Sequence, residues 1–199
     1  MAVNKLKVIM FLGTVRENRI GERVGIFMKK ILEETDHEVE VMDPKEIDFP
    51  LLKKAFHHYD DPSDAPQFLQ DCNAKIQEAD AFVVVSAEYN HSIPPALSNM
   101  MDHFSPSVYA YKPSGIVSYS PGQTAGVRAA IQLRSFLGVL GCMSVPSIFG
   151  IPQVHEAIDA DGEPLNKRMR EGALEMVQEL DWHAHAMRNH RMKVGVPTQ

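Results

Sequence analysis

Short runs of β-branched and apolar residues alternate with amphipathic helical patterns along the whole chain, and this alternation constrains the fold more than any other feature. The expected strands are Lys7–Leu12, Glu38–Met42, Ala81–Ser86, Ser114–Tyr119 and Met143–Phe149. The expected helices are Glu22–Glu34, Asp64–Ala79, Pro94–Phe104, Thr124–Leu140 and Asn166–Asn189. Because parallel strands need a crossover connection, strands that alternate with helices predict a parallel α/β sheet with helices on both faces.

The number of strands and the handedness of the crossovers leave few topologies for this sheet. Crossovers between parallel strands are right-handed, and five strands favour a flavodoxin-like, doubly wound sheet in the order 2-1-3-4-5. No repeat or linker divides the sequence, so residues 1–199 are expected to form one domain, with a loose tail from about residue 191. The long connection Pro44–Pro66 is expected to wrap one edge of the sheet or to reach a partner subunit.

Composition narrows the class of partner. The chain has 199 residues, 44% of them hydrophobic and 23% charged, which is typical of a globular protein. Its net charge of −6 argues against binding to nucleic acid or to an anionic membrane, since both depend on basic surface. No signal peptide or membrane-spanning stretch is recognised, and Cys72 and Cys142 are expected to be reduced and buried. These features predict a cytoplasmic protein.

The first candidate site is the loop after the first strand, residues 13–21. Ligands of open α/β sheets bind at the carboxyl ends of the strands where the winding reverses, here between strands one and three. The loop offers the hydroxyl of Thr14, the guanidinium groups of Arg16 and Arg19, and free N–H groups at the start of a helix, which together predict a phosphate site. It matches neither the Walker nor the dinucleotide-binding motif. An ordinary turn with two solvated arginines is the alternative.

Two further loops leave the same predicted edge. The loop after the third strand carries Glu88-Tyr89-Asn90, and prolines 94 and 95 delay its helix, so the backbone polar groups between Ala87 and Ser92 are expected to stay free for a ligand. A capped helix start with a surface tyrosine is the alternative. The loop after the fourth strand contains Gly122 and Gly126, where the backbone can approach a planar group; the alternative is an ordinary loop in which Thr124 caps the helix.

The loops carry three motifs: GTVR at residues 13–16, SAEYNHSIPPALSNMMD at 86–102 and SPGQTAGVRA at 120–129. Together they resemble the NADPH-dependent FMN reductase family, which includes quinone, azo-dye and chromate reductases. The corresponding family patterns are G-S-x-R, x-P-E-Y-N-x-x-[IP]-P-x-x-L-K-N-x-[IL]-D and S-x-G-x-x-G-G-x-R-A. The likeness spans nearly the whole chain. Thr14 replaces the commoner serine, Ala87 replaces proline, and Ala125 replaces the first glycine of a pair.

The resemblance implies FMN as cofactor and assigns its site. Its phosphate would be held by Thr14, Arg16 and the Arg19–Ile20 turn. The isoalloxazine ring would lie along the second loop and beside the third, next to these residues: Ala87, Glu88, Tyr89, Asn90, Ser120 and Gly122. No catalytic side chain and no metal is implied, because the flavin carries the redox chemistry.

The implied activity is that of an NAD(P)H oxidoreductase. NADPH or NADH would be the co-substrate, and a quinone or similar flat small molecule would be reduced by ping-pong hydride transfer through the flavin N5. The resemblance also implies a homodimer or tetramer, with a contact to which we assign Met100, Phe104 and Tyr109; the core is the alternative for the first two. Two other classes remain open: a flavodoxin-type FMN electron carrier, and a flavin-free interaction module on the same fold.

Overall fold

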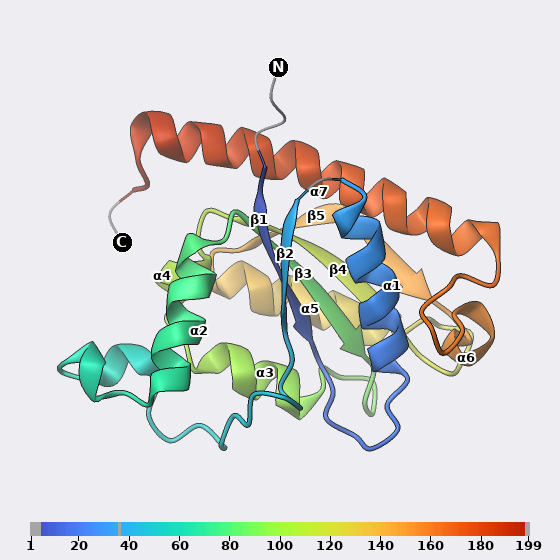
Figure 1. Ribbon diagram of the computed structural model, residues 1–199, viewed down its shortest axis with the longest axis horizontal. Helices are drawn as coiled ribbons and strands as arrows, with labels where there is room; N and C mark the ends of the chain where they lie inside the picture. The colour runs from blue at the N-terminus through green and yellow to red at the C-terminus, as the bar shows by residue number, and fades with distance from the viewer. Residues whose placement is uncertain (1–4, 36, 198–199) are drawn as a thin grey trace.

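The computed structural model describes residues 5–35 and 37–197. Its centre is a five-stranded parallel sheet in the order β2-β1-β3-β4-β5 (Figure 1). The strands are β1 Lys7–Leu12, β2 Glu38–Met42, β3 Ala81–Ala87, β4 Pro113–Tyr119 and β5 Met143–Ile151. The predicted fold and strand order are therefore confirmed, and the predicted bounds of the strands differ from the observed ones by two residues at most.

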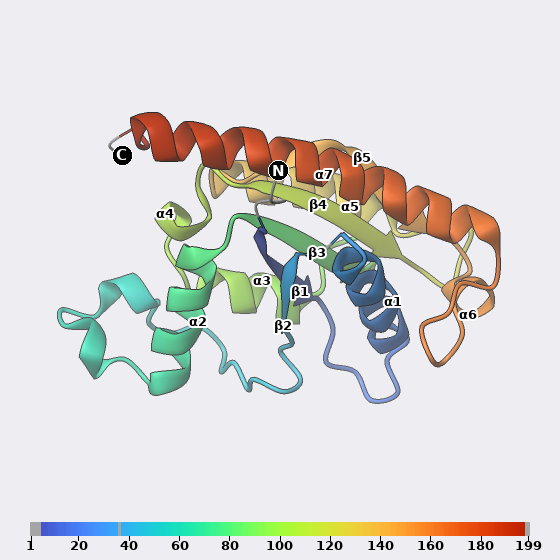
Figure 2. The same ribbon diagram turned by 45° about the horizontal axis from the view of Figure 1, so that its top comes forward.

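Helices cover both faces of the sheet (Figure 2). The helices are α1 Gly21–Glu33, α2 Gln67–Glu78, α3 Pro95–Asp102, α4 Pro106–Tyr109, α5 Val127–Val139, α6 Val154–Ala157 and α7 Lys167–Val194. Helices α1 and α7 bury their apolar sides in one core, and α2 to α5 do so in another on the opposite face. Among the described residues, no helix is both long and apolar enough to cross a membrane.

The central strands place the three candidate loops at one edge. All residues of β3 and β4 are buried, as expected for parallel strands covered on both faces. The register pairs Leu12 with Val85, and Ala87 with Tyr119. The loops after β1, β3 and β4 therefore start side by side at the carboxyl edge of the sheet.

The start of α2 differs from the prediction. The helix was expected to begin at Asp64, a residue type that often caps helices, but α2 begins at Gln67 and Pro66 occupies the cap position. Residues Pro62–Asp64 form a separate 3-10 turn, capped by the carboxylate of Asp61. The cause is Pro66, since a proline disfavours helical backbone in the residue before it.

The connection between β2 and α2 packs on helices rather than wrapping an edge of the sheet. Phe49 contacts Phe68 of α2 and Phe104 after α3, with ring centroids 5.6 and 6.2 Å apart. The side-chain amide of Asn99 in α3 accepts a hydrogen bond from Leu52 N (2.9 Å) and donates one to the connection's backbone. The prediction of an edge wrap is therefore wrong.

The assignment of Met100, Phe104 and Tyr109 to a subunit contact is also wrong. Their exposed fractions are 0, 2 and 0%, and all three belong to the core beneath α3 and α4. Tyr109 donates its buried hydroxyl to the carbonyl of Met101 (3.1 Å). The alternative location in the core thus holds for the first two residues and extends to the third.

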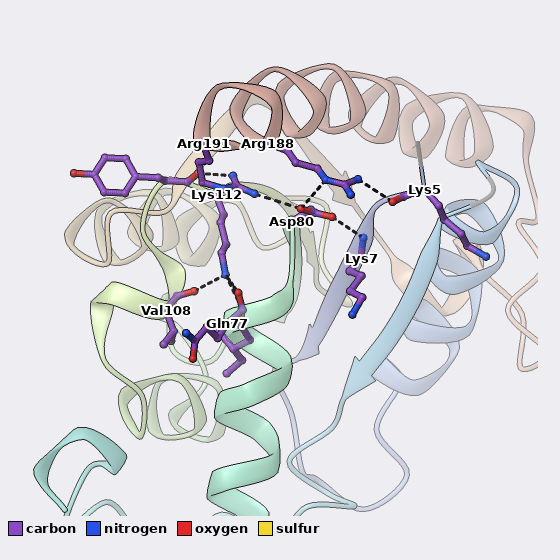
Figure 3. A network of polar contacts seen from close by, with 10 residues as sticks. Lys5, Lys7, Gln77, Asp80, Val108, Lys112, Arg188 and Arg191 are labelled. Carbon is purple, nitrogen blue, oxygen red and sulfur yellow. Dashed lines mark hydrogen bonds and ion pairs between the residues drawn. The ribbon is translucent and has the colours of Figure 1, made fainter. Parts of the chain in front are cut away.

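The last turns of α7 are held at the amino edge of the sheet (Figure 3). The carboxylate of Asp80 forms ion pairs with Arg188 (3.4 Å) and Arg191 (3.3 Å). As a result, α7 continues to Val194. The prediction of a loose tail from residue 191 is therefore wrong for residues 191–194, which are helical. The last two positions of that tail, 198–199, lie outside the described residues.

Candidate functional site

The first two loops meet at the carboxyl edge of the sheet. Gly13 N donates to the carbonyl of Val85 (2.9 Å), which joins the end of β1 to β3. The guanidinium of Arg16 lies over the ring of Tyr89, 3.7 Å from its centroid. This cation–π contact links the loop after β1 to the loop after β3.

Glu88 links the second loop to the third. Its carboxylate accepts hydrogen bonds from the backbone N–H groups of Arg128 (2.9 Å) and Ala129 (3.3 Å), and its side chain is 8% exposed. It therefore caps α5 from another loop, while Gly126 at the cap position supplies no side chain. The alternative that Thr124 caps this helix is wrong. The side chain of Glu88 faces α5, so only its backbone remains available to a ligand.

The loop after β1 presents a row of unbonded donors. Within the described residues, the backbone N–H groups of Thr14 to Asn18, and those of Ile20 and Gly21, have no hydrogen-bond partner, whereas the turn at residues 17–18 engages the N–H of Arg19. Ile20 occupies the cap position of α1, so the positive end of this helix's dipole faces the same loop. Arg16 is exposed, and its stacking on Tyr89 is the contact that the structure records for its guanidinium. The loop is therefore suited to bind an anion.

Arg19 lies in the same loop but faces the other way. Its guanidinium forms a bidentate ion pair with Asp43, and the two side chains are 5% and 7% exposed. It also donates to the backbone carbonyl of Thr14. The hydrogen bond to Asp43 raises the pKa of Arg19. The alternative of two solvated arginines thus holds for Arg16 and is wrong for Arg19. Asp43 was not predicted as part of this site, although an acidic residue directly after a predicted strand was a usable signal.

The loop after β3 forms a tight turn. Tyr89 and Ser92 exchange both backbone hydrogen bonds (3.0 and 2.9 Å), and between them Asn90 and His91 have positive φ angles of 51° and 63°. Two consecutive positive φ angles are typical of a type I′ turn, and such angles are uncommon in residues other than glycine. Gln132 of α5 holds the turn by donating to the carbonyl of His91 (2.8 Å).

This turn leaves only part of the loop's backbone free. The expectation that all the backbone polar groups between Ala87 and Ser92 are free is wrong for Tyr89 and Ser92, which close the turn, and for the carbonyl of His91, which Gln132 engages. Among the described residues, the N–H groups of Glu88, Asn90 and His91 have no partner. The loop therefore presents three backbone donors near the loop after β1.

Tyr119, the last residue of β4, was not predicted as a site residue. Its hydroxyl lies 3.5 Å from the hydroxyl of the buried Thr14. A Cβ on Gly21 would collide with the same Tyr119 hydroxyl, so a larger residue at the start of α1 would require the Tyr119 side chain to shift. Burial raises the pKa of Tyr119 to about 12, which keeps its hydroxyl protonated at neutral pH. Its position at the end of a buried strand was the signal available in the sequence.

The loop after β4 combines an open glycine with a confined one. A Cβ on Gly122 would meet only the hydroxyl of Ser120, 3.9 Å away, so the backbone there is open to an approaching group. Ser120 donates its hydroxyl to the carbonyl of Gly122 (3.1 Å). Gly126 has a φ of 72°, and a Cβ there would lie 2.8 Å from the carbonyl oxygen of Tyr119. Gly126 is therefore required by the fold, whereas Gly122 is available to a ligand.

This contrast predicts different effects for two matched substitutions. Gly126→Ala is expected to lower the free energy of unfolding by about 2 kcal/mol, because the methyl group meets backbone at a positive φ. Gly122→Ala is expected to change it by less than about 0.5 kcal/mol. Urea unfolding followed by circular dichroism measures both. Equal effects of the two variants would contradict the assignment.

Two residues that depart from the family pattern, Ala87 and Ala125, lie against neighbouring strands. Ala87 is the last residue of β3 and pairs with Tyr119, and unlike proline it retains a backbone N–H. Ala125 has a φ of 54°, and its methyl group lies against Gly150 of β5, where a Cβ would be only 3.1 Å away. Each substitution is therefore accommodated by the neighbouring strand.

Comparisons with known proteins agree with this architecture. The family described as NADPH-dependent FMN reductase matches residues 6–156. A quinone reductase of Escherichia coli K12 is 30% identical over 167 residues, which cover 78% of this chain and 86% of that protein. A 2-hydroxy-1,4-benzoquinone reductase of a Burkholderia species is 25% identical over 174 residues, covering 83% and 88%.

A solved structure shares the fold. The flavoenzyme FerB of Paracoccus denitrificans, an NAD(P)H:(acceptor) oxidoreductase, superposes with a TM-score of 0.72 at 22% identity, covering 93% of this chain and 98% of its own. The matched family spans β1 to β5 and thus includes all three loops of the candidate site. The chain therefore belongs to the NADPH-dependent FMN reductase family.

Proposed function

We propose that this chain is an FMN-dependent NAD(P)H oxidoreductase that reduces quinones or similar flat acceptors. The observation that carries the proposal is a pair of neighbouring loops with unbonded backbone donors at the carboxyl edge of β1 and β3. The loop after β1 is suited to bind an anion, and the loop after β3 offers a short row of backbone N–H donors. Family membership and relatives named as quinone reductases support the same activity.

The loop after β1 fits a phosphate group. We assign phosphate binding to the hydroxyl of Thr14, the guanidinium of Arg16 and the free N–H groups up to Gly21. Ile20 contributes through the start of α1, whose dipole favours an anion. Arg19, by contrast, is assigned to the loop's internal structure because its guanidinium is paired with Asp43.

The other two loops fit the edges of a planar heterocycle that presents hydrogen-bond acceptors. The N–H groups of Glu88 and Asn90 would donate from one side, with Ala87 and Tyr89 in the same strip of backbone. Ser120 and the open backbone of Gly122 would lie at another side. When bound, FMN would supply hydride exchange at its N5 atom, and the chain's own groups would orient and retain it.

Absorption spectroscopy tests the proposal directly. Purified protein incubated with FMN and then desalted is expected to keep the visible absorption of an oxidised flavin, and anaerobic NADPH is expected to bleach it. Subsequent addition of a quinone should restore the colour. Protein that stays colourless after incubation with FMN would contradict the proposed cofactor, and bound flavin that NADPH does not bleach would contradict the proposed co-substrate.

Steady-state kinetics test whether donor and acceptor use one site in turn. The proposed ping-pong cycle predicts parallel lines in double-reciprocal plots when NADPH is varied at several fixed quinone concentrations. Intersecting lines would instead indicate that both substrates are bound together. Repeating the series with NADH gives the nucleotide preference from the ratio of kcat/KM values.

We further propose a cytoplasmic homodimer or tetramer. Val127, Ile131 and Val139 of α5 are 45, 55 and 83% exposed, and Val127 begins the helix next to the loop after β4. Exposed apolar side chains on one helix favour contact with another copy of the chain. Cys72 and Cys142 are free, buried thiols, as is common in a reducing compartment, and burial raises their pKa values to about 11 and about 12, which makes them unreactive. Light scattering during gel filtration would give the oligomeric state.

A further inference from the structure

Asp43 and Arg19 form a buried ionic cluster beneath the loop after β1. The Nη1 of Arg19 donates to Oδ1 of Asp43 (2.7 Å), and its Nη2 contacts the other carboxylate oxygen. Nη1 also donates to the carbonyl oxygen of Thr14. Oδ1 of Asp43 in addition accepts the backbone N–H of Lys45 (2.9 Å). The cluster thus connects the chain leaving β2 with the chain leaving β1.

The electrostatics of the cluster argue against a direct role in anion binding. A bidentate pair is close to neutral as a unit, and each partner already satisfies the other's charge. A carboxylate this close to the loop would repel a phosphate if Arg19 did not neutralise it. Arg16 is different, because its guanidinium is exposed and no carboxylate pairs with it among the described residues.

The backbone of the loop needs such support. Asn18, directly before Arg19, has a positive φ of 52°, which costs energy in any residue with a side chain. Arg19 follows this residue, and its bond to the carbonyl of Thr14 closes the stretch of loop that contains Asn18, while its bond to Asp43 holds the guanidinium in place. A conformation of this kind persists only where the surrounding contacts determine it.

We propose that Asp43 is a positioning residue for the phosphate-binding loop, acting through Arg19. Asp43 holds the guanidinium of Arg19, which in turn holds the carbonyl of Thr14, so that the Thr14 hydroxyl and the N–H groups after it stay directed at the ligand. The inference rests on the proposed function and assigns a role to a residue that touches neither ligand nor substrate. In this proposal Arg19 is no longer a phosphate ligand, and Arg16 is the arginine that binds the phosphate.

The variant Asp43→Asn separates positioning from direct binding. Asparagine keeps the size of the side chain and an acceptor for Lys45 N but removes the charge that holds Arg19. If the pair positions the loop, FMN affinity measured by fluorescence quenching should fall about ten-fold, while riboflavin, which lacks the phosphate, should be affected less than about two-fold. If Arg19 were itself a phosphate ligand, freeing its guanidinium would leave FMN affinity unchanged or raise it, and the proposal would be overturned.

A double variant tests whether the pair contributes only to folding. Replacing both partners with apolar residues of similar size, Asp43→Leu with Arg19→Met, leaves no buried charge unpaired and is expected to keep the melting temperature near that of the wild type. The positioning role predicts that this folded variant still binds FMN about ten-fold more weakly. Wild-type FMN affinity in the folded double variant would show that the pair serves folding alone.

The control is the exposed bidentate pair between Glu34 and Arg170, at the far end of α1. Glu34→Gln removes the same type of charge and should leave both flavin affinities unchanged. If the wild type binds neither FMN nor riboflavin, the proposed function fails, but the positioning pair can still be judged by NMR order parameters of the backbone. Lower order parameters for residues 14–21 in Asp43→Asn than in the wild type would then support it, and equal values would overturn it.

Discussion

The Arg16→Ala variant is expected to bind FMN about 10- to 100-fold more weakly than the wild type. Arg16 carries the exposed guanidinium of the loop after β1, and a charge-assisted hydrogen bond to a phosphate is worth about 1.5 to 3 kcal/mol. Its stacking on Tyr89 holds the guanidinium beside the neighbouring loop and limits the conformational freedom lost on binding. Titration of flavin fluorescence with protein measures the affinity.

Two controls isolate the contribution of the phosphate. Riboflavin lacks that group, so its affinity should change little in the Arg16→Ala variant. Arg23 lies in the first turn of α1 and donates to the carbonyl of Ile158 (3.1 Å), away from the loop. Arg23→Ala removes the same charge and is expected to keep FMN affinity within about two-fold. An equal loss in both arginine variants would mean that net charge, rather than a contact at Arg16, governs binding.

The fold was accessible from the sequence because its signals are local. Each strand is a short apolar run, such as Ala81–Ser86, and β3 is buried on both faces as that composition requires. With five strands and right-handed crossovers, strand order followed from general rules. Boundaries were less accurate where two signals competed. At Asp64 a favourable capping residue preceded a proline, and the proline determined where α2 begins.

The candidate site was predictable to the level of its loops but not of its side-chain contacts. The location of all three loops at the carboxyl edge of the sheet follows from the predicted strand order alone. That Glu88 reaches α5, or that Arg19 turns inward to Asp43, depends on partners 24 or more positions away in the sequence. Such pairings are set by the exact position of each loop in space. Sequence spacing therefore identified the right residue types, while the structure decided which of them face a ligand.

Lys112 gives the largest expected change in stability. It lies at the amino edge of the sheet and is 6% exposed, and its ammonium donates to the carbonyls of Ile76 (2.7 Å), Gln77 (2.8 Å) and Val108 (2.8 Å) (Figure 3). The first two carbonyls belong to the last turn of α2, where no helical N–H can reach them. Lys112→Met leaves three acceptors unpaired and is expected to lower the free energy of unfolding by about 3 kcal/mol. The melting temperature should fall by about 6 to 12 °C.

The control for this variant lies at the same edge. Lys7 forms an exposed ion pair with Glu78, and the two side chains are 50% and 64% exposed. Lys7→Met removes the same charge without unpairing a buried acceptor, so its melting temperature should equal that of the wild type. If both lysine variants lose equal stability, the three carbonyl contacts of Lys112 do not hold α2 and α4 in place.

The pH dependence of stability provides a second measurement on Lys112. Burial lowers the pKa of this ammonium to about 8, so the native protein releases its proton before the unfolded chain does. Between about pH 8 and about pH 10.4 the unfolded chain therefore holds more protons, and the stability contributed by Lys112 rises with pH by at most about 1.4 kcal/mol per unit. That contribution is lost as the pH falls through the native pKa. The difference in unfolding free energy between wild type and Lys112→Met should consequently widen from about pH 7.5 to about pH 9.5. If the difference instead narrows over this range, the native state retains the proton of Lys112 to a higher pH than the unfolded chain does.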